Sequence, residues 1–279
     1  KPSDAKEWAI RMSENGFAYS TINNYKRSLR ASFYIAIQDD YVRKNPFDFQ
    51  LNTVIDDDTV PKTILTLEQE ARLLDFAKSD TVYHKNYDEI LILLKTGLRI
   101  SELCGMTVTD LDFENHLILV NHQLLRNTEL GYYIETPKTK SSERQVPMVE
   151  VTCQALKRVL AVQNQNECVE IDGYSNFLFL NRNGYPKTAC DFNSILRNLI
   201  KKYNKCHEEK LPHITPHTLR HTFCTNCANA GMNPKALQYI MGHANITMTL
   251  NYYAHATCNS AMEEMKRLEK EQQARCLVL

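Results

Sequence analysis

Apolar residues recur with helical spacing over most of the chain. In the segment 20–38 they fall at intervals of three and four, which predicts an amphipathic helix with Ser20 as its N-cap. Another helix is predicted over residues 4–15. The apolar positions of the longer helix are Ile22, Tyr25, Leu29, Phe33 and Ala36. The N-terminal region is therefore expected to be helical.

A linker is predicted after these two helices. The segment DDDTVPK (56–62) combines a run of acidic residues with a proline, which is typical of a connection between domains. We therefore expect a small helical domain over residues 1–60 and a larger domain over residues 61–279. Two helices alone are marginally stable, and the chain opens on Lys1. The first domain is thus expected to be truncated at its N-terminus or to depend on a partner.

The larger domain is predicted to be mostly helical. Thr66 and Gln69 have the spacing of a capping box before an apolar helix, and a helix over residues 84–96 is expected to end at Gly97. Three short antiparallel strands are predicted at 116–126, 131–137 and 144–148. Further helices are predicted over residues 150–166, 190–204, 216–230, 234–241, 246–254 and 257–273. The expected fold class is mainly α with a small antiparallel β-sheet.

Composition is that of an ordinary globular protein and excludes several classes. Apolar residues make up 43% of the chain and charged residues 24%, which argues against wholesale disorder. No apolar run approaches the roughly 18 residues that a membrane span requires, and there is no signal-like start. The nine cysteines lack a disulfide-framework spacing. We therefore expect a cytoplasmic protein with mostly buried thiols.

Charge is balanced overall but clustered locally. The formal net charge is zero, which does not favour nonspecific binding to nucleic acid. However, Lys26, Arg27 and Arg30 gather on the predicted helix 20–38, and residues 182–220 hold a second basic cluster. Such clusters can contact phosphate even when the total charge is zero, although solvated helix faces explain them equally well.

The segment PHTLRHTFCTNC (216–227) places two histidines and two cysteines close together, which suggests zinc. Along a helix, however, the outermost two lie about 15 Å apart, so four ligands on one straight helix cannot meet on one ion. His217 and Arg220 instead project from one face, behind Pro216 at a helix start. An imidazole and a guanidinium presented together suit a phosphate oxygen. The segment therefore indicates an anion site rather than a metal site.

Three further segments carry chemistry. TGLRISEL (96–103) places Arg99 after a glycine turn between two helical segments, where Glu102 is interpreted as a helix cap or an arginine-orienting group. TPKTKSSERQVP (136–147) reads as a polar hairpin that displays Lys138 and Lys140. IMGHANITMTLNYYAHA (240–256) contributes His243 and a pair of tyrosines. Each segment alone also fits an ordinary structural role.

Taken in this order and at these separations, the segments resemble the tyrosine recombinases, and most closely the integrases of phages and conjugative transposons. The resemblance covers residues 62–273 and implies that residues 1–60 are a core-binding DNA-binding domain. It implies a site-specific recombinase that acts on double-stranded DNA as a homo-oligomer, dimer to tetramer, with neither cofactor nor metal nor membrane. It also implies that such a protein integrates and excises a mobile element.

The resemblance also implies roles for particular residues. A tyrosine hydroxyl attacks a backbone phosphate, which leaves a 3′-phosphotyrosyl link and a free 5′-hydroxyl. Arg99 and Arg220 hold the nonbridging oxygens, His217 bonds the phosphate or acts as a base, and His243 supports the transition state. The implied catalytic set is Arg99, Lys138, His217, Arg220, His243 and Tyr253, and the implied DNA contacts are Lys26, Arg27, Arg30 and Lys140.

Two assignments keep alternatives. Tyr253 precedes a small residue and a histidine as in the family, and Tyr252 is the alternative nucleophile. Lys138, at the junction of strand and turn, is the expected acid for the leaving oxygen, and Lys140 is its alternative. The alternative function is a DNA-binding regulator on the same scaffold that does not cleave.

Overall fold

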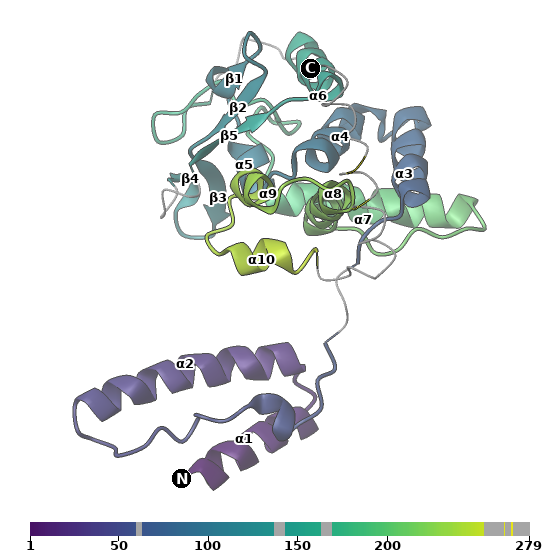
Figure 1. Cartoon of the computed structure of the whole chain (residues 1–279). Helices are drawn as coiled ribbons and strands as arrows, with labels where there is room; N and C mark the ends of the chain where they lie inside the picture. The colour runs from purple at the N-terminus through teal and green to yellow at the C-terminus, as the bar shows by residue number, and fades with distance from the viewer. Residues whose placement is uncertain (60–62, 137–142, 163–168, 254–264, 266–268, 270–279) are drawn as a thin grey trace. The chain divides into compact units, whose positions relative to one another are not determined.

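The chain folds into two units, Lys1–Lys62 and Thr63–Leu279, each packed within itself. The computed structural model describes residues 1–59, 63–136, 143–162, 169–253, 265 and 269 (Figure 1). Most of the predicted helix 257–273 lies outside these described residues. That the first unit binds DNA stays a prediction.

Two long helices build the first unit: α1, Pro2–Glu14, and α2, Tyr19–Gln38. Their shared core contains Ala9 and Ile22. The prediction that Ser20 caps α2 is wrong, because the helix begins at Tyr19. The backbone N–H of Tyr19 donates instead to the carboxylate of Asp58 at 3.0 Å, so a distant side chain satisfies the helix start.

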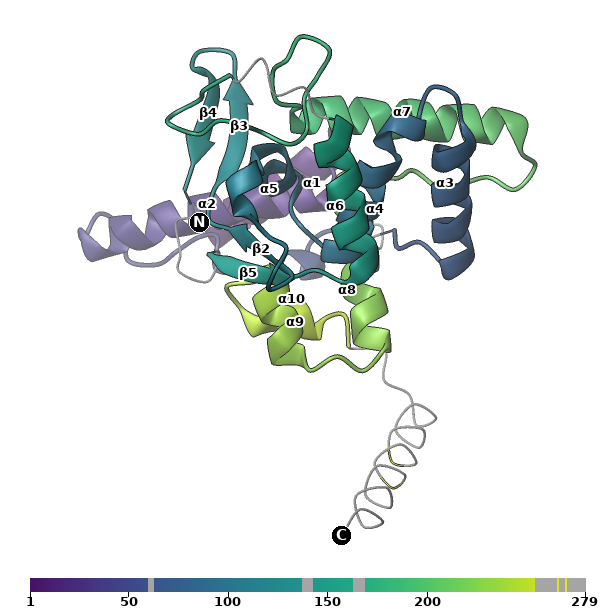
Figure 2. The same cartoon turned by 90° about the horizontal axis from the view of Figure 1, so that it is seen from above.

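Eight α-helices among the described residues shape the second unit. The most buried is α4, Tyr87–Thr96, which packs against α6 and α8 (Figures 1 and 2). The predicted capping box of Thr66 and Gln69 is confirmed at the start of α3. The remaining bounds are α3 Leu67–Ser79, α5 Ile100–Gly105, α6 Glu150–Val162, α7 Ala189–Cys206, α8 Pro216–Asn229, α9 Pro234–Met241 and α10 Ile246–Leu250.

The strands form two small antiparallel sheets instead of the single sheet expected. The first predicted strand, 116–126, is interrupted at His122, whose buried imidazole bonds the carbonyl of Gly105 through Nε2 at 2.7 Å. This contact with the end of α5 separates one strand from the next. In one sheet the order is β1 Leu111–Asp112, β2 Leu117–Val120 and β5 Arg144–Pro147; the other pairs β3 Gln123–Asn127 with β4 Gly131–Glu135.

Two glycines end helices that converge on one region. Gly97 ends α4 with φ of 63°, and Gly242 ends α9 with φ of 60°, the left-handed conformation that side chains disfavour. A Cβ on Gly97 would overlap the ring of Phe223 on α8, so this position also requires the absence of a side chain. The carbonyl groups at these two helix ends become acceptors in the candidate site.

Candidate active site

Arg99 lies between α4 and α5 and is held by three hydrogen bonds. As the N-cap of α5, its backbone N–H donates to Oε2 of Glu102 at 2.8 Å. Its Nη1 donates to Oε1 of Glu102 at 2.6 Å, and its Nη2 donates to the carbonyl of Gly242 at 2.8 Å. About a third of the side chain, 32%, stays exposed, so the guanidinium is oriented yet still accessible.

Arg220 projects from α8 into the same region. Pro216 occupies the first turn of α8, as the sequence predicts, and Thr215 is the N-cap. The buried guanidinium donates to the carbonyl of Gly97, the C-cap of α4, and to that of Met241, the last residue of α9. Burial, followed by the charge of Arg99, lowers the pKa of Arg220 to about 10, so the group remains cationic at neutral pH.

His243 follows Gly242 directly and is buried beside these arginines. Its Nδ1 lies 2.9 Å from the hydroxyl of Thr249 on α10, which orients the ring. Burial, followed by the positive charges of Arg220 and Arg99, lowers the pKa of His243 to about 4. The imidazole is therefore neutral at pH 7, with one ring nitrogen left to serve as a donor or an acceptor.

Glu102 and Arg144 complete the cluster. Arg144, the first residue of β5, donates from Nη1 and Nη2 to the two oxygens of Glu102, at 2.9 and 2.8 Å. Burial opposes ionisation of Glu102, but the hydrogen bonds and charge of Arg144, with the charges of Arg99 and Arg220, lower its pKa to about 2. Three guanidinium groups thus surround one carboxylate, which leaves a net positive charge at this place.

Sequence reasoning missed Arg144. The strand RQVP alternates, and its burial places Arg144 and Val146 on the inward face, where a charge requires a partner. The alternation that puts Arg144 on the same face as Val146 could have been read from the sequence. The interpretation of Glu102 as a cap and an arginine-orienting group is consistent with its bonds to the backbone and side chain of Arg99.

The two tyrosines after α10 point to different partners. The hydroxyl of Tyr252 bonds Nδ1 of His221, one turn beyond His217 on α8, while the hydroxyl of Tyr253 donates to the carbonyl of Met232 at 2.6 Å. Burial raises the pKa of Tyr253 and raises that of Tyr252 to about 12. Either hydroxyl therefore needs a base before it can act as a nucleophile.

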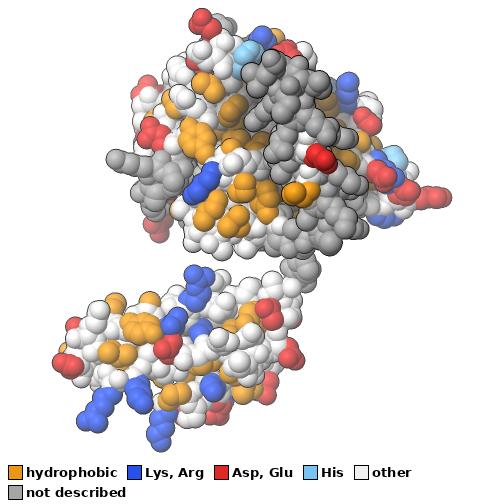
Figure 3. Space-filling view, in the orientation of Figure 1, with side chains coloured by type: hydrophobic (Ala, Val, Ile, Leu, Met, Phe, Trp, Pro, Cys, Tyr) orange, Lys and Arg blue, Asp and Glu red, His pale blue; other side chains and the backbone are white. Residues whose placement is uncertain are grey.

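Apolar surface lies beside these tyrosines. Tyr239, Met248 and Leu250, on α9 and α10, are each at least 44% exposed, and Figure 3 shows apolar side chains gathered over these helices. The segment of Tyr252 and Tyr253 is thus bordered by apolar side chains.

The structure brings Arg99, Arg220 and His243 together within one unit, and places His217, an exposed residue, on the helix that carries Arg220. The hydroxyl of Tyr253 bonds elsewhere, to the loop before α9. Lys138 and Lys140 lie outside the described residues. The catalytic roles of all these residues stay predictions.

The predicted DNA contacts of α2 have different environments. Arg27 is exposed, whereas Lys26 is buried with its ammonium 4.7 Å from the ring centre of Phe49. Burial, followed by the charge of Arg30, lowers the pKa of Lys26. Arg30 pairs with Asp48 at 2.6 Å. Arg27 and Arg30 are thus both exposed, but Arg30 already has a carboxylate partner.

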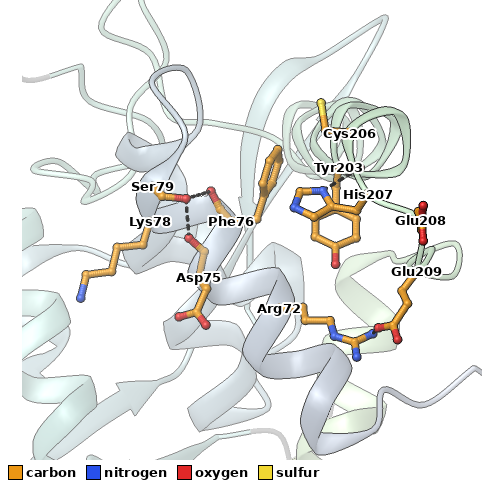
Figure 4. Close-up of a pocket in the computed structure, with 10 residues that line it drawn as sticks. All are labelled: Arg72, Asp75, Phe76, Lys78, Ser79, Tyr203, Cys206, His207, Glu208 and Glu209. Carbon is orange, nitrogen blue, oxygen red and sulfur yellow. Dashed lines mark hydrogen bonds and ion pairs between the residues drawn. The ribbon is translucent and has the colours of Figure 1, made fainter.

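A second candidate site is a cavity in which several side chains are already paired with one another. A cavity of about 1110 Å³ lies between α3 and the end of α7 (Figure 4). There Tyr203 and His207 stack with ring centres 4.0 Å apart, and Arg72 pairs with Glu209, so these side chains already have partners. Within the described part of the chain, no three His, Cys, Asp or Glu side chains are grouped to hold a metal ion.

No helix in the described ranges combines the length and apolar character of a membrane span.

Comparison with known proteins gives one consistent result. The chain matches the phage integrase family over residues 63–260. The transposase of transposon Tn916 from Enterococcus faecalis is 76% identical over 278 residues, which cover 100% of this chain and 69% of that protein. The tyrosine recombinase XerC of Bacillus licheniformis is 27% identical over 254 residues, which cover 91% of this chain and 76% of that protein.

Solved structures agree with these sequence matches. The integrase of transposon Tn1549, solved in complex with a circular intermediate DNA, is 64% identical with a TM-score of 0.91, covering 96% of this chain and 85% of that one. A lambda integrase dimer bound to a core site is 15% identical with a TM-score of 0.56, covering 91% and 79%, a likeness of fold alone.

Proposed function

The chain belongs to the phage integrase family, and from this premise we propose which of its residues cleave and rejoin DNA. The chain is a site-specific tyrosine recombinase that integrates and excises a mobile element. The hydroxyl oxygen of Tyr253 forms a bond to a backbone phosphorus and loses its proton to a base, for which we propose His217. The bond to the 5′-oxygen breaks, and that oxygen takes a proton from Lys138. A 5′-hydroxyl from another strand then reverses the step, so the phosphodiester energy is conserved. Its proposed substrate is double-stranded DNA, and we propose that it acts in the cytoplasm.

The convergence of Arg99, Arg220 and His243 on the ends of α4 and α9 carries this proposal. With Arg144 and Glu102, the cluster has three guanidinium groups and one carboxylate, a net of two positive charges. A phosphodiester carries one negative charge, and its pentavalent transition state carries two. The cluster therefore matches the transition state better than the ground state, which is the condition for catalysis.

Positive side chains here do the work that metal ions do in many phosphoryl-transfer enzymes. Arg99 is partly exposed and can hold one nonbridging oxygen. Arg220 is bonded to two carbonyls but keeps 5% of its surface exposed, and it holds the other oxygen. His243 is neutral because of its lowered pKa, so it contributes a hydrogen bond rather than a charge.

Spacing in a relative supports Tyr253 as the nucleophile. Structures of the Tn1549 integrase include one variant with an arginine replaced by lysine and one with a tyrosine replaced by phenylalanine. The separation between those two positions equals that between Arg99 and Tyr253. Tyr252, which bonds His221, is one residue off this separation. In the present conformation the hydroxyl of Tyr253 must leave the carbonyl of Met232 before attack.

A suicide duplex tests the nucleophile. In such a DNA a nick lets a short oligonucleotide diffuse away after cleavage, which traps the covalent adduct. We expect the unmutated chain to form the adduct with EDTA present, Tyr253→Phe to form none, and Tyr252→Phe to form it. An adduct in Tyr253→Phe but not in Tyr252→Phe would transfer the role to Tyr252. Binding without any adduct in the unmutated chain would favour the non-cleaving regulator.

A sulfur-substituted duplex tests the general acid. With sulfur in place of the bridging 5′-oxygen, the leaving thiolate needs no proton. We propose that Lys138 protonates this oxygen. Lys138→Ala is therefore expected to cleave the normal duplex slowly and the sulfur duplex at the unmutated rate. If the sulfur duplex restored the cleavage rate of Lys140→Ala and not that of Lys138→Ala, the general acid would be Lys140.

A further inference from the structure

Arg144 combines complete burial with a full set of partners close to the reacting groups. Its side chain is 0% exposed, and none of the expected roles includes it. Its Nε donates to the carbonyl of Ile240 at 2.7 Å, in the last turn of α9, and both Nη atoms donate to Glu102. Because the guanidinium is closed off from solvent, it has no access to a DNA phosphate.

We propose that Arg144 is a positioning residue of the recombinase, which acts through Glu102 to orient Arg99 and keep its charge available for the phosphate. This inference rests on the function proposed above. It assigns to Arg144 an effect on the rate of strand cleavage and little effect on the affinity for DNA.

The geometry around Glu102 shows how such an effect is transmitted. Oε1 accepts from Nη1 of Arg99 at 2.6 Å and from Nη1 of Arg144 at 2.9 Å. Oε2 accepts from the backbone N–H of Arg99 and from Nη2 of Arg144, each at 2.8 Å. One buried carboxylate thus joins the two arginines, and the bidentate fork of Arg144 fixes the plane in which Glu102 receives Arg99.

Charge gives a second reason for Arg144. If Arg99 were the only partner of Glu102, the two charges would cancel at the place where positive charge is needed. Arg144 supplies the counter-charge, so the trio of Arg99, Glu102 and Arg144 keeps one net positive charge. Removing Arg144 would also leave Glu102 buried with a single partner, a costly state that draws it closer to Arg99.

Arg144 also joins segments that carry other candidate residues. It begins β5, which starts six positions after Lys138 in the sequence. A Cβ on Gly242, the residue before His243, would lie 3.0 Å from Nη1 of Arg144. The absence of a side chain at Gly242 lets the guanidinium pass close to the backbone beside His243. Arg144 therefore links the start of β5, Arg99 and the end of α9.

The test compares binding with cleavage in the full chain. The dissociation constant for DNA and the first-order rate of adduct formation on a suicide duplex, at saturating protein, are measured for Arg144→Lys, Arg144→Met and Glu102→Gln. The matched control is Arg158→Met, because Arg158 forms another ion pair, with Asp88, that belongs to no proposed site. Arg144→Lys keeps the charge but loses the fork.

We expect Arg144→Lys and Glu102→Gln to cleave DNA at least about tenfold more slowly, because each loses one strong interaction. Their dissociation constants for DNA are expected to stay within about threefold of the unmutated chain. Arg158→Met is expected to change neither. Because Arg144 acts through Glu102, the double variant Glu102→Gln/Arg144→Met is expected to be no slower than the slower single variant.

Several outcomes overturn the inference. One is cleavage by Arg144→Lys at the unmutated rate. Another is a double variant whose cleavage rate falls by the product of the two single losses, as for independent sites. The third is a folded variant in which DNA affinity and cleavage rate fall in parallel. If Arg144→Met and Arg144→Lys lose the native circular dichroism spectrum, the test rests on Glu102→Gln. An unchanged rate of adduct formation by Glu102→Gln refutes the proposal that Glu102 orients Arg99. Absence of any adduct in the unmutated chain refutes the proposed function instead.

Discussion

Acidification is expected to destabilise the second unit through His243. His243 is 7% exposed, and burial with the charges of Arg220 and Arg99 lowers its pKa from 6.5 to about 4. Between these values the unfolded chain binds a proton that the folded chain does not. The free energy of unfolding therefore falls as the pH falls through this window.

The magnitude follows from the two pKa values. Between pH 7 and pH 5 the difference in proton binding amounts to about 2 kcal/mol of lost stability, since one pKa unit corresponds to ~1.4 kcal/mol. Glu102 acts in a lower window. Its pKa falls from 4.5 to about 2 on folding, so its contribution is present above the unfolded pKa and is lost as the pH falls toward the folded one. At pH 5 the expected loss of unfolding free energy therefore comes mainly from His243 rather than from Glu102.

Urea denaturation followed by far-ultraviolet circular dichroism at pH 7 and pH 5 measures this loss. The matched variant is His243→Gln, which cannot titrate, while the other histidines are common to both proteins. We expect the unmutated chain to lose about 2 kcal/mol more than His243→Gln over this interval. The only tryptophan, Trp8, lies in the first unit, so its fluorescence reports that unit separately. Equal losses in both proteins would refute the reasoning.

Three further predictions concern separate parts of the chain. Arg27→Ala is expected to lower the slope of log affinity against log salt by about 1, as for a lost phosphate contact, whereas Lys26→Met leaves it unchanged. Leu93→Ala, in the fully buried core of α4, is expected to cost roughly 2–5 kcal/mol in urea denaturation. Iodoacetamide followed by peptide mass spectrometry should label exposed Cys206 well before Cys104, since burial raises the pKa of Cys104.

Each of these predictions has a contrary result. An equal change of salt slope for Arg27→Ala and Lys26→Met would show that burial does not separate the two side chains. A cost below about 1 kcal/mol for Leu93→Ala would mean that the surrounding core collapses into the space. Labelling of Cys104 at the rate of Cys206 in the native protein would show that α5 opens readily.

Local sequence patterns predicted the helices well because helix ends depend on neighbours along the chain. The box of Thr66 and Gln69 and the left-handed end at Gly97 involve residues within one helical turn. The helix predicted over 234–241 has the bounds of α9. Ser20 failed as a cap because Asp58, far along the chain, supplied the acceptor.

Strand pairing was less predictable. The apolar pattern of 116–126 continues through residues that the structure divides between two sheets. At the point of division His122 bonds the carbonyl of Gly105, a contact with the end of α5 that alternation along one strand cannot reveal.

The sequence by itself determined the family, the mainly helical fold and the candidate residues, because each motif is a short run whose spacing survives without tertiary contacts. Only the tertiary structure decided how the candidates are held. Arg99 reaches the carbonyl of a residue 143 positions away, and Arg144 reaches Glu102 across 42. A buried charge is stable only with a partner, and folding alone determines which distant carboxylate or carbonyl becomes that partner.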